Sequence, residues 1–343
     1  MKELIYKIVE GYEPTLDEME KILSLNEEDA EVLFKIADEV KKKYFGNEVH
    51  IRGIIEFSSY CRADCYYCGL RCSNRSLPRY RMEKDEIVEC AKQAVDAGYR
   101  SLVLQSGEDL YYTKEIIGEI VERIKQYSDV AITLSIGERS FEEYEYLKEK
   151  GADRFLMKHE TADESLYNSL HPHSSFKNRI ECLKNLKTLG YQVGSGFMIG
   201  LPGQTLRTVA KDIMLLKELD VDMAGIGPFI PHKDTPLGKY DAGSAFLTVK
   251  AVALTRILLK RPHLPATTAL GVLNTKYKDK VFSAGANVIM QKVEPHKYRR
   301  LYEIYPKDIK FEKSIREERK ELENYLLSLG LEISDSRGDA LKI

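Results

Sequence analysis

Short apolar runs alternate with stretches of helical periodicity along most of the chain. The helical stretches repeat apolar residues every three or four positions, whereas the strand-like runs are short and mostly apolar. The strand-like runs are 50–57, 101–105, 130–135, 153–158, 192–199, 222–227, 264–269 and 286–290. The helical stretches include 83–97, 113–127, 141–150, 176–189, 205–219 and 246–260. Eight such units predict a (β/α)8 TIM-type barrel, with a doubly wound open sheet as the alternative.

Glycines mark the same point in several of these units. Gly98, Gly151, Gly190 and Gly285 each stand one to three residues before a strand-like run. A left-handed glycine commonly ends a helix before the chain turns into a strand. The repeat therefore favours alternating helices and strands over a scatter of unrelated glycines.

Helices are also predicted before the barrel. Thr15 and Glu18 have the spacing of a capping box, which starts a helix. Asn26 is suited to cap the next helix, and Gly46 is suited to end it. The first 46 residues therefore read as a helical extension.

A strongly charged tail follows Tyr305-Pro306. Its apolar positions Tyr325, Leu326 and Leu329 indicate a helix packed on the outside of the barrel, and its charged positions indicate a solvated face. The resulting division is an N-terminal helical extension, the barrel and a C-terminal helical tail, at 1–46, 47–306 and 307–343.

Composition excludes several classes of protein. The chain has 343 residues, of which 43% are apolar and 31% charged, as in a globular protein. A net charge of −2 gives no basic field for nucleic acid. The N-terminus does not resemble a signal peptide, and no apolar run approaches the roughly 20 residues of a membrane span. Six cysteines, four of them in one loop, do not resemble a secreted disulfide framework, so we expect a cytoplasmic, oxygen-sensitive protein.

The cysteine loop carries the most specific chemistry. Cys61, Cys65 and Cys68 have the spacing C-x3-C-x2-C, directly after the first strand-like run. Three thiolates on one loop suit a 4Fe–4S cluster whose fourth iron stays open to a ligand. In a barrel, this loop lies at the carboxyl ends of the strands, where active sites lie.

Cys72 adds a fourth thiol to the same loop and leaves two alternatives open. One is a zinc site that uses all four cysteines, and the other is a set of buried, unreactive thiols. We expect Cys72 to be a bystander. If it bound the fourth iron, no open position would remain.

Polar residues follow other strands at the same end of the barrel. Ser106 and Glu108 suit an ammonium group, although they also fit an ordinary turn and helix cap. Ser135 offers a hydroxyl to a ribose or is a satisfied hydroxyl inside the barrel. Glu160 suits a ribose or sulfonium contact. Arg179 suits a forked contact with a carboxylate or lies on the surface.

Further candidates lie on the later strands. Ile226, among small residues, suits a wall for adenine. Thr267 and Thr268 are placed to reach the lumen, and Tyr305 to close the cavity bottom. Ordinary barrel packing is the alternative for all four.

Three cations complete the set of candidates. Arg52 and Arg154 stand in otherwise apolar runs, and Lys158 is the last residue of the second of these runs. An unpaired buried charge is costly, so these residues suggest a cationic patch that receives an anionic substrate. The alternative is an internal pair with a carboxylate, or an outward-facing side chain.

Taken in order, these motifs resemble those of the HydE family, the radical S-adenosylmethionine (SAM) maturases of FeFe-hydrogenase. The resemblance covers about residues 30 to 306, and the family is similar in turn to biotin synthase and methylornithine synthase. The matching segments are IIEFSSYCRADCYYCGL, LQSGED, DRFLMKHETAD, GFMIGLPGQT, GIGPFIPHKDTPL, LPATTA and GANVIM.

The resemblance implies both cofactors and their ligands. Cys61, Cys65 and Cys68 would hold the cluster that cleaves SAM to a 5′-deoxyadenosyl radical, and Tyr67 would offer adenine a backbone contact. The remaining SAM contacts would come from Ser106, Glu108, Ser135, Glu160, Arg179 and Ile226.

The resemblance also implies a role in assembling the di-iron subcluster of the hydrogenase. The substrate would be an iron complex of carbon monoxide, cyanide and cysteine made by the maturase HydG, with HydF as a further partner. Such an anion would suit Arg52, Arg154 and Lys158. Some family members carry a second cluster on three further cysteines, but no cysteine follows Cys182 here, so we expect one cluster.

Two rival functions remain open. One is a radical SAM mutase that resembles methylornithine synthase and takes an amino-acid-derived substrate. The other is a cluster or zinc scaffold without catalysis, which would form no 5′-deoxyadenosine from SAM.

Overall fold

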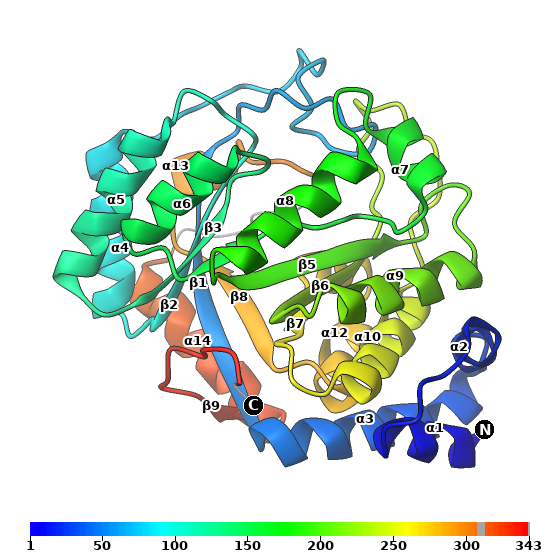
Figure 1. Ribbon diagram of the computed structural model, residues 1–343. Helices are drawn as coiled ribbons and strands as arrows, with labels where there is room; N and C mark the ends of the chain where they lie inside the picture. Colours follow the sequence, from blue (N-terminus) through cyan, green and yellow to red (C-terminus); the bar gives the residue numbers. More distant parts are fainter. Residues whose placement is uncertain (307–312, 342–343) are drawn as a thin grey trace.

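Eight parallel strands and their helices form a barrel in the computed structural model, which describes residues 1–306 and 313–341 (Figure 1). The strands are β1 (Glu48–Ser58), β2 (Ser101–Ser106), β3 (Ala131–Ser135), β4 (Arg154–Leu156), β5 (Gln192–Ile199), β6 (Met223–Pro228), β7 (Pro265–Ala266) and β8 (Val288–Lys292). Their order is β6-β5-β4-β3-β2-β1-β8-β7. A bridge joins Met223 of β6 to His263, two residues before β7, so the two ends of the sheet meet and the TIM-type barrel is confirmed rather than the open sheet.

The helices that connect successive strands agree with the sequence periodicity to within two residues. They are α4 (Lys84–Asp96), α5 (Lys114–Tyr127), α6 (Phe141–Glu149), α8 (Phe176–Thr188), α9 (Leu206–Glu218) and α10 (Ala245–Leu259). Shorter helices lie in the remaining connections, namely α7 (Glu164–Leu170), α11 (Thr268–Leu273), α12 (Thr275–Lys280), the 3-10 turn η1 (Val281–Ala284) and α13 (His296–Arg299). Gly98, Gly151, Gly190 and Gly285 all have positive φ before a strand, as predicted.

Two strands are shorter than their apolar runs. The run 264–269 predicts one strand, but β7 ends at Ala266 because Thr267 is the N-cap of α11. The run 153–158 yields only Arg154–Leu156. The chain stays hydrogen-bonded to β5 through Met157 and Glu160, but the φ of 64° at Glu160 is incompatible with a continuous strand.

The N-terminal helices are α1 (Lys2–Val9), α2 (Leu16–Leu23) and α3 (Glu27–Phe45). The capping box of Thr15 and Glu18 is present, and Asn26 caps α3, which Gly46 ends. Helix α3 packs against α10 and η1. These helices lie at the bottom of Figure 1, opposite the cysteine loop at the top.

The C-terminal tail contains a helix and a short strand. Helix α14 (Ile315–Ser328) buries Leu326 and partly buries Tyr325, as predicted, but Leu329 lies beyond it and is exposed. Strand β9 (Glu332–Ile333) pairs with the start of β1, which the sequence did not predict. Residues 307–312 of the predicted tail lie outside the described residues, and the three-part domain division stays a prediction.

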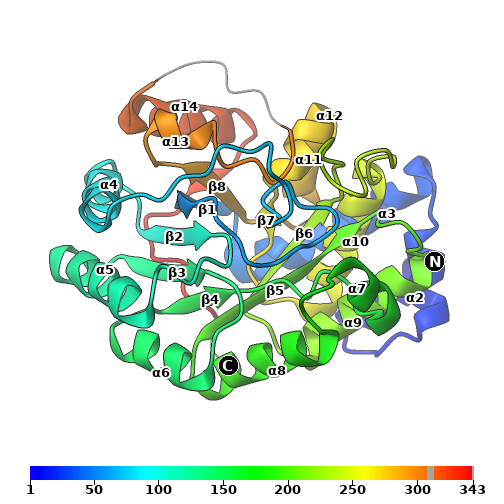
Figure 2. The ribbon, with the colours of Figure 1, turned by 90° about the horizontal axis from the view of Figure 1, so that it is seen from above.

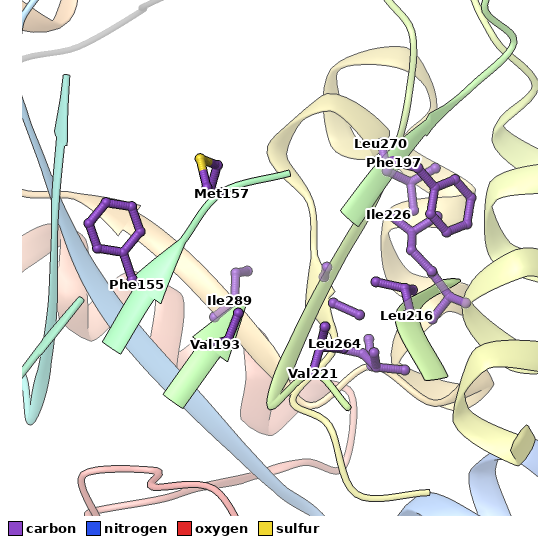
Figure 3. Close-up of a cluster of buried hydrophobic side chains, with 14 of the residues drawn as sticks. Phe155, Met157, Val193, Phe197, Leu216, Val221, Ile226, Leu264, Leu270 and Ile289 are labelled. Carbon is purple, nitrogen blue, oxygen red and sulfur yellow. The ribbon is translucent and has the colours of Figure 1, made fainter. Parts of the chain in front are cut away.

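The apolar core lies largely between the strands and the surrounding helices. Figure 3 shows part of it, with Ile226 of β6 close to Phe197 of β5 and Leu270 of α11. The described residues contain no helix long and apolar enough to cross a membrane.

Candidate functional site

The cysteine loop runs across the mouth of the barrel between β1 and α4 (Figure 2). Arg79 holds its shape, because its guanidinium donates to the carbonyl oxygens of Ser59, Leu70, Arg71 and Asn74 at 2.5–3.1 Å. The loop also meets α7, since the Tyr66 amide donates to the Leu170 carbonyl at 3.0 Å. Arg79 was missed in the sequence because nothing distinguishes a loop arginine that binds backbone from a solvated one.

Cys61, Cys65 and Cys68 are free, partly exposed thiols on this loop. Burial raises the pKa of each, and it raises the pKa of Cys68 to about 12. The thiols are therefore protonated unless a cation stabilises their thiolates, as bound iron does. The donor set fits an iron–sulfur cluster.

Spacing separates a cluster from a single metal ion. In the described part of the chain, the sulfur atoms of Cys61, Cys65 and Cys68 do not all lie within 4.8 Å of one another. A zinc ion with Zn–S bonds of about 2.3 Å would draw them to roughly 3.8 Å. A 4Fe–4S cluster binds each cysteine through a different iron and needs wider spacing. The arrangement therefore favours the cluster over the four-cysteine zinc alternative.

Gly107 lets the second strand approach the cysteine loop. A Cβ atom there would stand 2.2 Å from the Tyr60 carbonyl oxygen and 2.8 Å from Cys61 Cβ. This close contact lets the Glu108 amide donate to Cys61 Sγ at 3.3 Å. The turn at Ser106-Gly107-Glu108-Asp109 and the cysteine loop are therefore packed together as one unit.

Opposite charges meet beside this unit. Glu108 accepts from Arg62 Nε at 3.1 Å and lies 3.7 Å from Arg179 Nη2. Arg179 also pairs with Glu138 at 2.8 Å. A carboxylate and a guanidinium this close can bind the ammonium and carboxylate of one amino-acid group. Sequence reasoning missed Glu138, which follows the third strand by three residues.

Tyr67 is partly buried between the loop and α7. Its hydroxyl lies 2.7 Å from His171 Nε2, and the His171 ring stacks on Tyr167 at 3.9 Å. Burial, followed by the charge of Glu160, raises the pKa of Tyr67 well above its usual value. His171 and Tyr167 were not found in the sequence, because ring stacking across a helix end leaves no motif.

Glu160 has a strained backbone held from two sides. Its amide donates to the Gly196 carbonyl at 3.0 Å, and its carbonyl accepts from the Met198 amide at 3.1 Å. Its side chain pairs with Lys158 at 3.2 Å and lines the lumen. Backbone strain kept by its surroundings is typical of binding sites.

The serines occupy more ordinary positions. Ser106 is buried, and its hydroxyl donates to the Gly107 carbonyl at 2.6 Å, as in the ordinary-turn alternative. Ser135 ends β3 and is paired in register with Gln105. Gln105 lines the lumen and was overlooked as a site residue.

The contact of Ile226 with adenine stays a prediction, and its side chain does not line the lumen. The Ile226 side chain belongs to the apolar core outside the barrel, whereas Gly225 and Gly227 line the lumen. Residues alternate between the two faces of a strand, so the small neighbours face inward and Ile226 faces outward. Phe229 and Ile230, just beyond, contribute apolar surface to the cavity instead.

A cavity of about 610 Å³ occupies the lumen below the cysteine loop. Arg52 lies in its wall and is only 2% exposed. Its Nη1 contacts Met223 Sδ at 2.8 Å, while Nε and Nη2 have no hydrogen-bond partner within the described residues. Burial and then the nearby Arg154 lower the pKa of Arg52 well below its usual range. The cavity wall thus contains a buried cation that forms no ion pair within the described residues, although the charge of Asp339 acts to raise its pKa.

The other candidates also line the lumen, but Tyr305 is not at its bottom, because the neighbouring Ile304 carbonyl accepts from the Gly69 amide of the cysteine loop at 2.9 Å. Lys158, Thr267, Thr268 and Tyr305 all line the cavity. Burial raises the pKa of Tyr305 to about 12. The cavity also contains an ion pair that the sequence analysis missed, between Glu56 of β1 and Lys292 of β8. Glu56 stands four residues after Arg52 on the same strand face, so the period of two was a signal for it.

Arg154 does not join the cationic patch. It lies near enough to Arg52 to lower the pKa of that side chain, but it does not line the cavity. Its guanidinium pairs with Asp339 at 2.8 Å and donates to Gln192, Ser101 and the Arg337 carbonyl. The internal Arg–carboxylate pair, which was the alternative, is therefore the one observed. The partner was hidden in the sequence because it lies 185 residues away in the tail.

The fold and the three-cysteine site together define a radical SAM enzyme, and the model of the radical SAM superfamily matches residues 55–216. The chain is 52% identical over 306 residues to the [FeFe] hydrogenase maturase subunit HydE of Thermotoga maritima, covering 89% of this chain and 87% of that protein. It is 32% identical to 3-methylornithine synthase of Methanosarcina acetivorans, over 82% of this chain and 81% of that protein. The crystal structure of methylornithine synthase superposes with a TM-score of 0.86 at 28% identity, covering 96% and 97% of the two chains.

The chain belongs to the HydE family of FeFe-hydrogenase maturases. As a radical SAM enzyme it uses a 4Fe–4S cluster and SAM. The predicted family and barrel are confirmed, and the non-catalytic scaffold is set aside.

Proposed function

We propose that this enzyme acts in assembly of the hydrogenase di-iron subcluster, on a small anionic iron complex of carbon monoxide, cyanide and cysteine bound in the lumen. HydG would supply the complex, and the product would pass toward HydF. The observation that carries this proposal is Arg52, a buried guanidinium with two unpartnered nitrogen atoms among the described residues, in the wall of a 610 Å³ cavity. A bound anion would compensate that charge.

The other cations of the lumen are already paired. Lys158 lies 3.2 Å from Glu160, and Lys292 is bonded to Glu56. These pairs are locally neutral, so Arg52 is the main attraction for an anion. Thr267 and Thr268 offer hydroxyl donors to its cyanide groups, and Tyr305 lies beside them.

The rim would hold the cofactors. Cys61, Cys65 and Cys68 would bind a single cluster, since no cysteine follows Cys182. When bound, the cluster and SAM supply a 5′-deoxyadenosyl radical. Further SAM contacts are proposed for a set of rim residues, namely Tyr67 through its backbone, Ser106, Glu108, Ser135, Glu160 and Arg179.

Glu108 and Arg179 would divide the methionine group between them. Glu108 would accept from the ammonium, and Arg179 would donate to the carboxylate, because the two side chains lie 3.7 Å apart. The salt bridge from Arg179 to Glu138 would keep the guanidinium aimed at this point. Orientation of the methionine end would fix the position of the adenosyl group above the lumen.

A reconstituted maturation reaction tests the proposal. Reduced protein is mixed with SAM, with and without the complex made by HydG, and 5′-deoxyadenosine is measured. HydF and apo-hydrogenase are then added, and hydrogen evolution is measured, with Cys68→Ala as the inactive control.

We expect the complex to increase 5′-deoxyadenosine and active hydrogenase to require the wild-type chain. Unchanged 5′-deoxyadenosine with the complex, together with equal maturation without this chain, would contradict the proposal. A cytoplasmic location stays a prediction.

A further inference from the structure

Cys72 is the thiol that the cluster does not use, and the structure places it in a group of its own. Its backbone amide donates to the Ala63 carbonyl at 2.9 Å, which brings Cys72 beside Asp64. A ligand atom from each of Asp64, Cys72 and His173 lies within 4.8 Å of the other two. Within residues 1–306 and 313–341, this is the one group of three His, Cys, Asp or Glu side chains with the spacing of a metal site.

The Asp64 carboxylate is held in a fixed orientation. Its Oδ2 accepts from Arg71 Nη2 at 2.7 Å and from Ser73 Oγ at 3.0 Å, and its Oδ1 accepts from the Ser73 amide at 3.2 Å. A carboxylate offers about four lone-pair positions, so these three bonds leave one on Oδ1. Carboxylates that bind metals are typically oriented by such outer hydrogen bonds.

His173 lies on the exposed turn between α7 and α8, and the turn is anchored on both sides of it. Buried His171 bonds the Tyr67 hydroxyl at 2.7 Å. Ser174 donates from its amide to the His171 carbonyl and from its hydroxyl to Glu138. The turn therefore holds its position while the His173 imidazole is free to adjust by the ångström or so that tight coordination needs.

We propose that Asp64, Cys72 and His173 form a second metal site, which binds a divalent transition metal of the zinc type through one oxygen, one sulfur and one nitrogen atom. A thiolate and an imidazole select zinc-like ions over magnesium or calcium. Water completes a tetrahedral set. Bound metal replaces the thiol proton of Cys72, which passes to solvent.

The site joins two elements that the radical chemistry needs in register. Asp64 and Cys72 flank Cys65 and Cys68 on the cysteine loop, whereas His173 lies at the start of the segment that leads to Arg179. A metal bound across them ties the loop to the α7–α8 turn. It also explains why Cys72 is present without serving as a cluster ligand.

Zinc content of the cluster-loaded enzyme tests the site, because iron then occupies Cys61, Cys65 and Cys68. The anaerobic holoenzyme is equilibrated with zinc sulfate and desalted, and zinc and iron are measured by mass spectrometry. Zinc K-edge absorption spectroscopy counts the sulfur ligands. The variants are Cys72→Ala and His173→Ala, with Cys182→Ser as a control that removes a thiol elsewhere.

We expect about one zinc per chain with a single sulfur ligand, unchanged iron, and the same result for the control. Each site variant should weaken zinc binding by at least about tenfold while retaining iron. His173 is exposed, so its variant should fold normally, and zinc should raise the melting temperature of the wild type and of the control but not of the site variants. Absence of bound zinc, retention of zinc by both variants, or a site with several sulfur ligands would overturn the proposal.

Discussion

Replacing Arg52 by methionine should make the protein more stable and less active at the same time. Methionine keeps much of the length of the side chain and removes its charge. The arginine is 2% exposed and has two nitrogen atoms without hydrogen-bond partners in the described part of the chain. A side chain kept for folding would not be left in this state, whereas one kept for an anionic ligand would.

The expected increase in the free energy of unfolding follows from these contacts. A buried donor without a partner costs about 1–3 kcal/mol, and exchanging buried ionic groups for apolar ones of similar volume often stabilises by about 1–4 kcal/mol. We expect Arg52→Met to increase the free energy of unfolding by about 2 kcal/mol. With 343 residues and an unfolding entropy of about 2.1 cal/mol/K per residue, this raises the melting temperature by roughly 3 °C.

Two measurements on one preparation check this prediction. Thermal unfolding is compared in the same cluster state, and 5′-deoxyadenosine is measured with and without the iron complex. Arg52→Met should keep basal SAM cleavage but lose the increase caused by the complex. Arg52→Lys, which retains a cation, should lose less of that increase and gain no stability. A methionine variant that is less stable than wild type, or that still responds fully to the complex, would refute the reasoning.

Three further predictions concern the tail, the loop and the cofactor count. Burial raises the pKa of Asp339, but hydrogen bonds from Gln192 and Arg154 outweigh this effect, so the pKa is lowered overall. The ion pair of Asp339 with Arg154 therefore stabilises the fold above about pH 4, the pKa of an unfolded Asp. This stabilisation is lost as the pH falls through the pKa of Asp339 in the folded protein. Asp339→Asn should therefore cost about 1 kcal/mol at pH 7 in denaturant unfolding, and the difference should shrink under acid; a constant difference would contradict this. Gly107→Ala should displace the cysteine loop, because the added Cβ would clash with the Tyr60 carbonyl oxygen. The rate of SAM cleavage should fall by about tenfold or more. A wild-type rate would show that the loop can move to accommodate the methyl group without loss of activity. Iron analysis should find about four atoms per chain, and about eight would reveal a second cluster.

The barrel could be predicted because its signals are local. Apolar runs, helical periodicity and glycine at helix ends each act within a few residues, and they gave six of the connecting helices to within two residues. The failures came from longer-range effects. Strand β9 forms only because β1 offers an unpaired start to a segment nearly 300 residues later, and Thr267 ends β7 by capping a short helix.

In the site, too, the features with local sequence signals were predicted, and those set by distant residues were not. The cysteine spacing and the turn at residues 106–109 are local and were found, as were the lumen positions of Arg52 and Thr267. Arg154 was misassigned because its partner Asp339 lies in the tail. The outward direction of the Ile226 side chain could have been predicted from the alternation of its neighbours along the strand.

The central claim is that three thiolates hold the cluster and leave one iron open to SAM. The yield of 5′-deoxyadenosine from single cysteine variants tests it most directly. Alanine at Cys61, Cys65 or Cys68 should abolish the product, whereas Cys72→Ala should still form it. Loss of product in the Cys72 variant with full iron content, or its persistence without Cys68, would contradict the account.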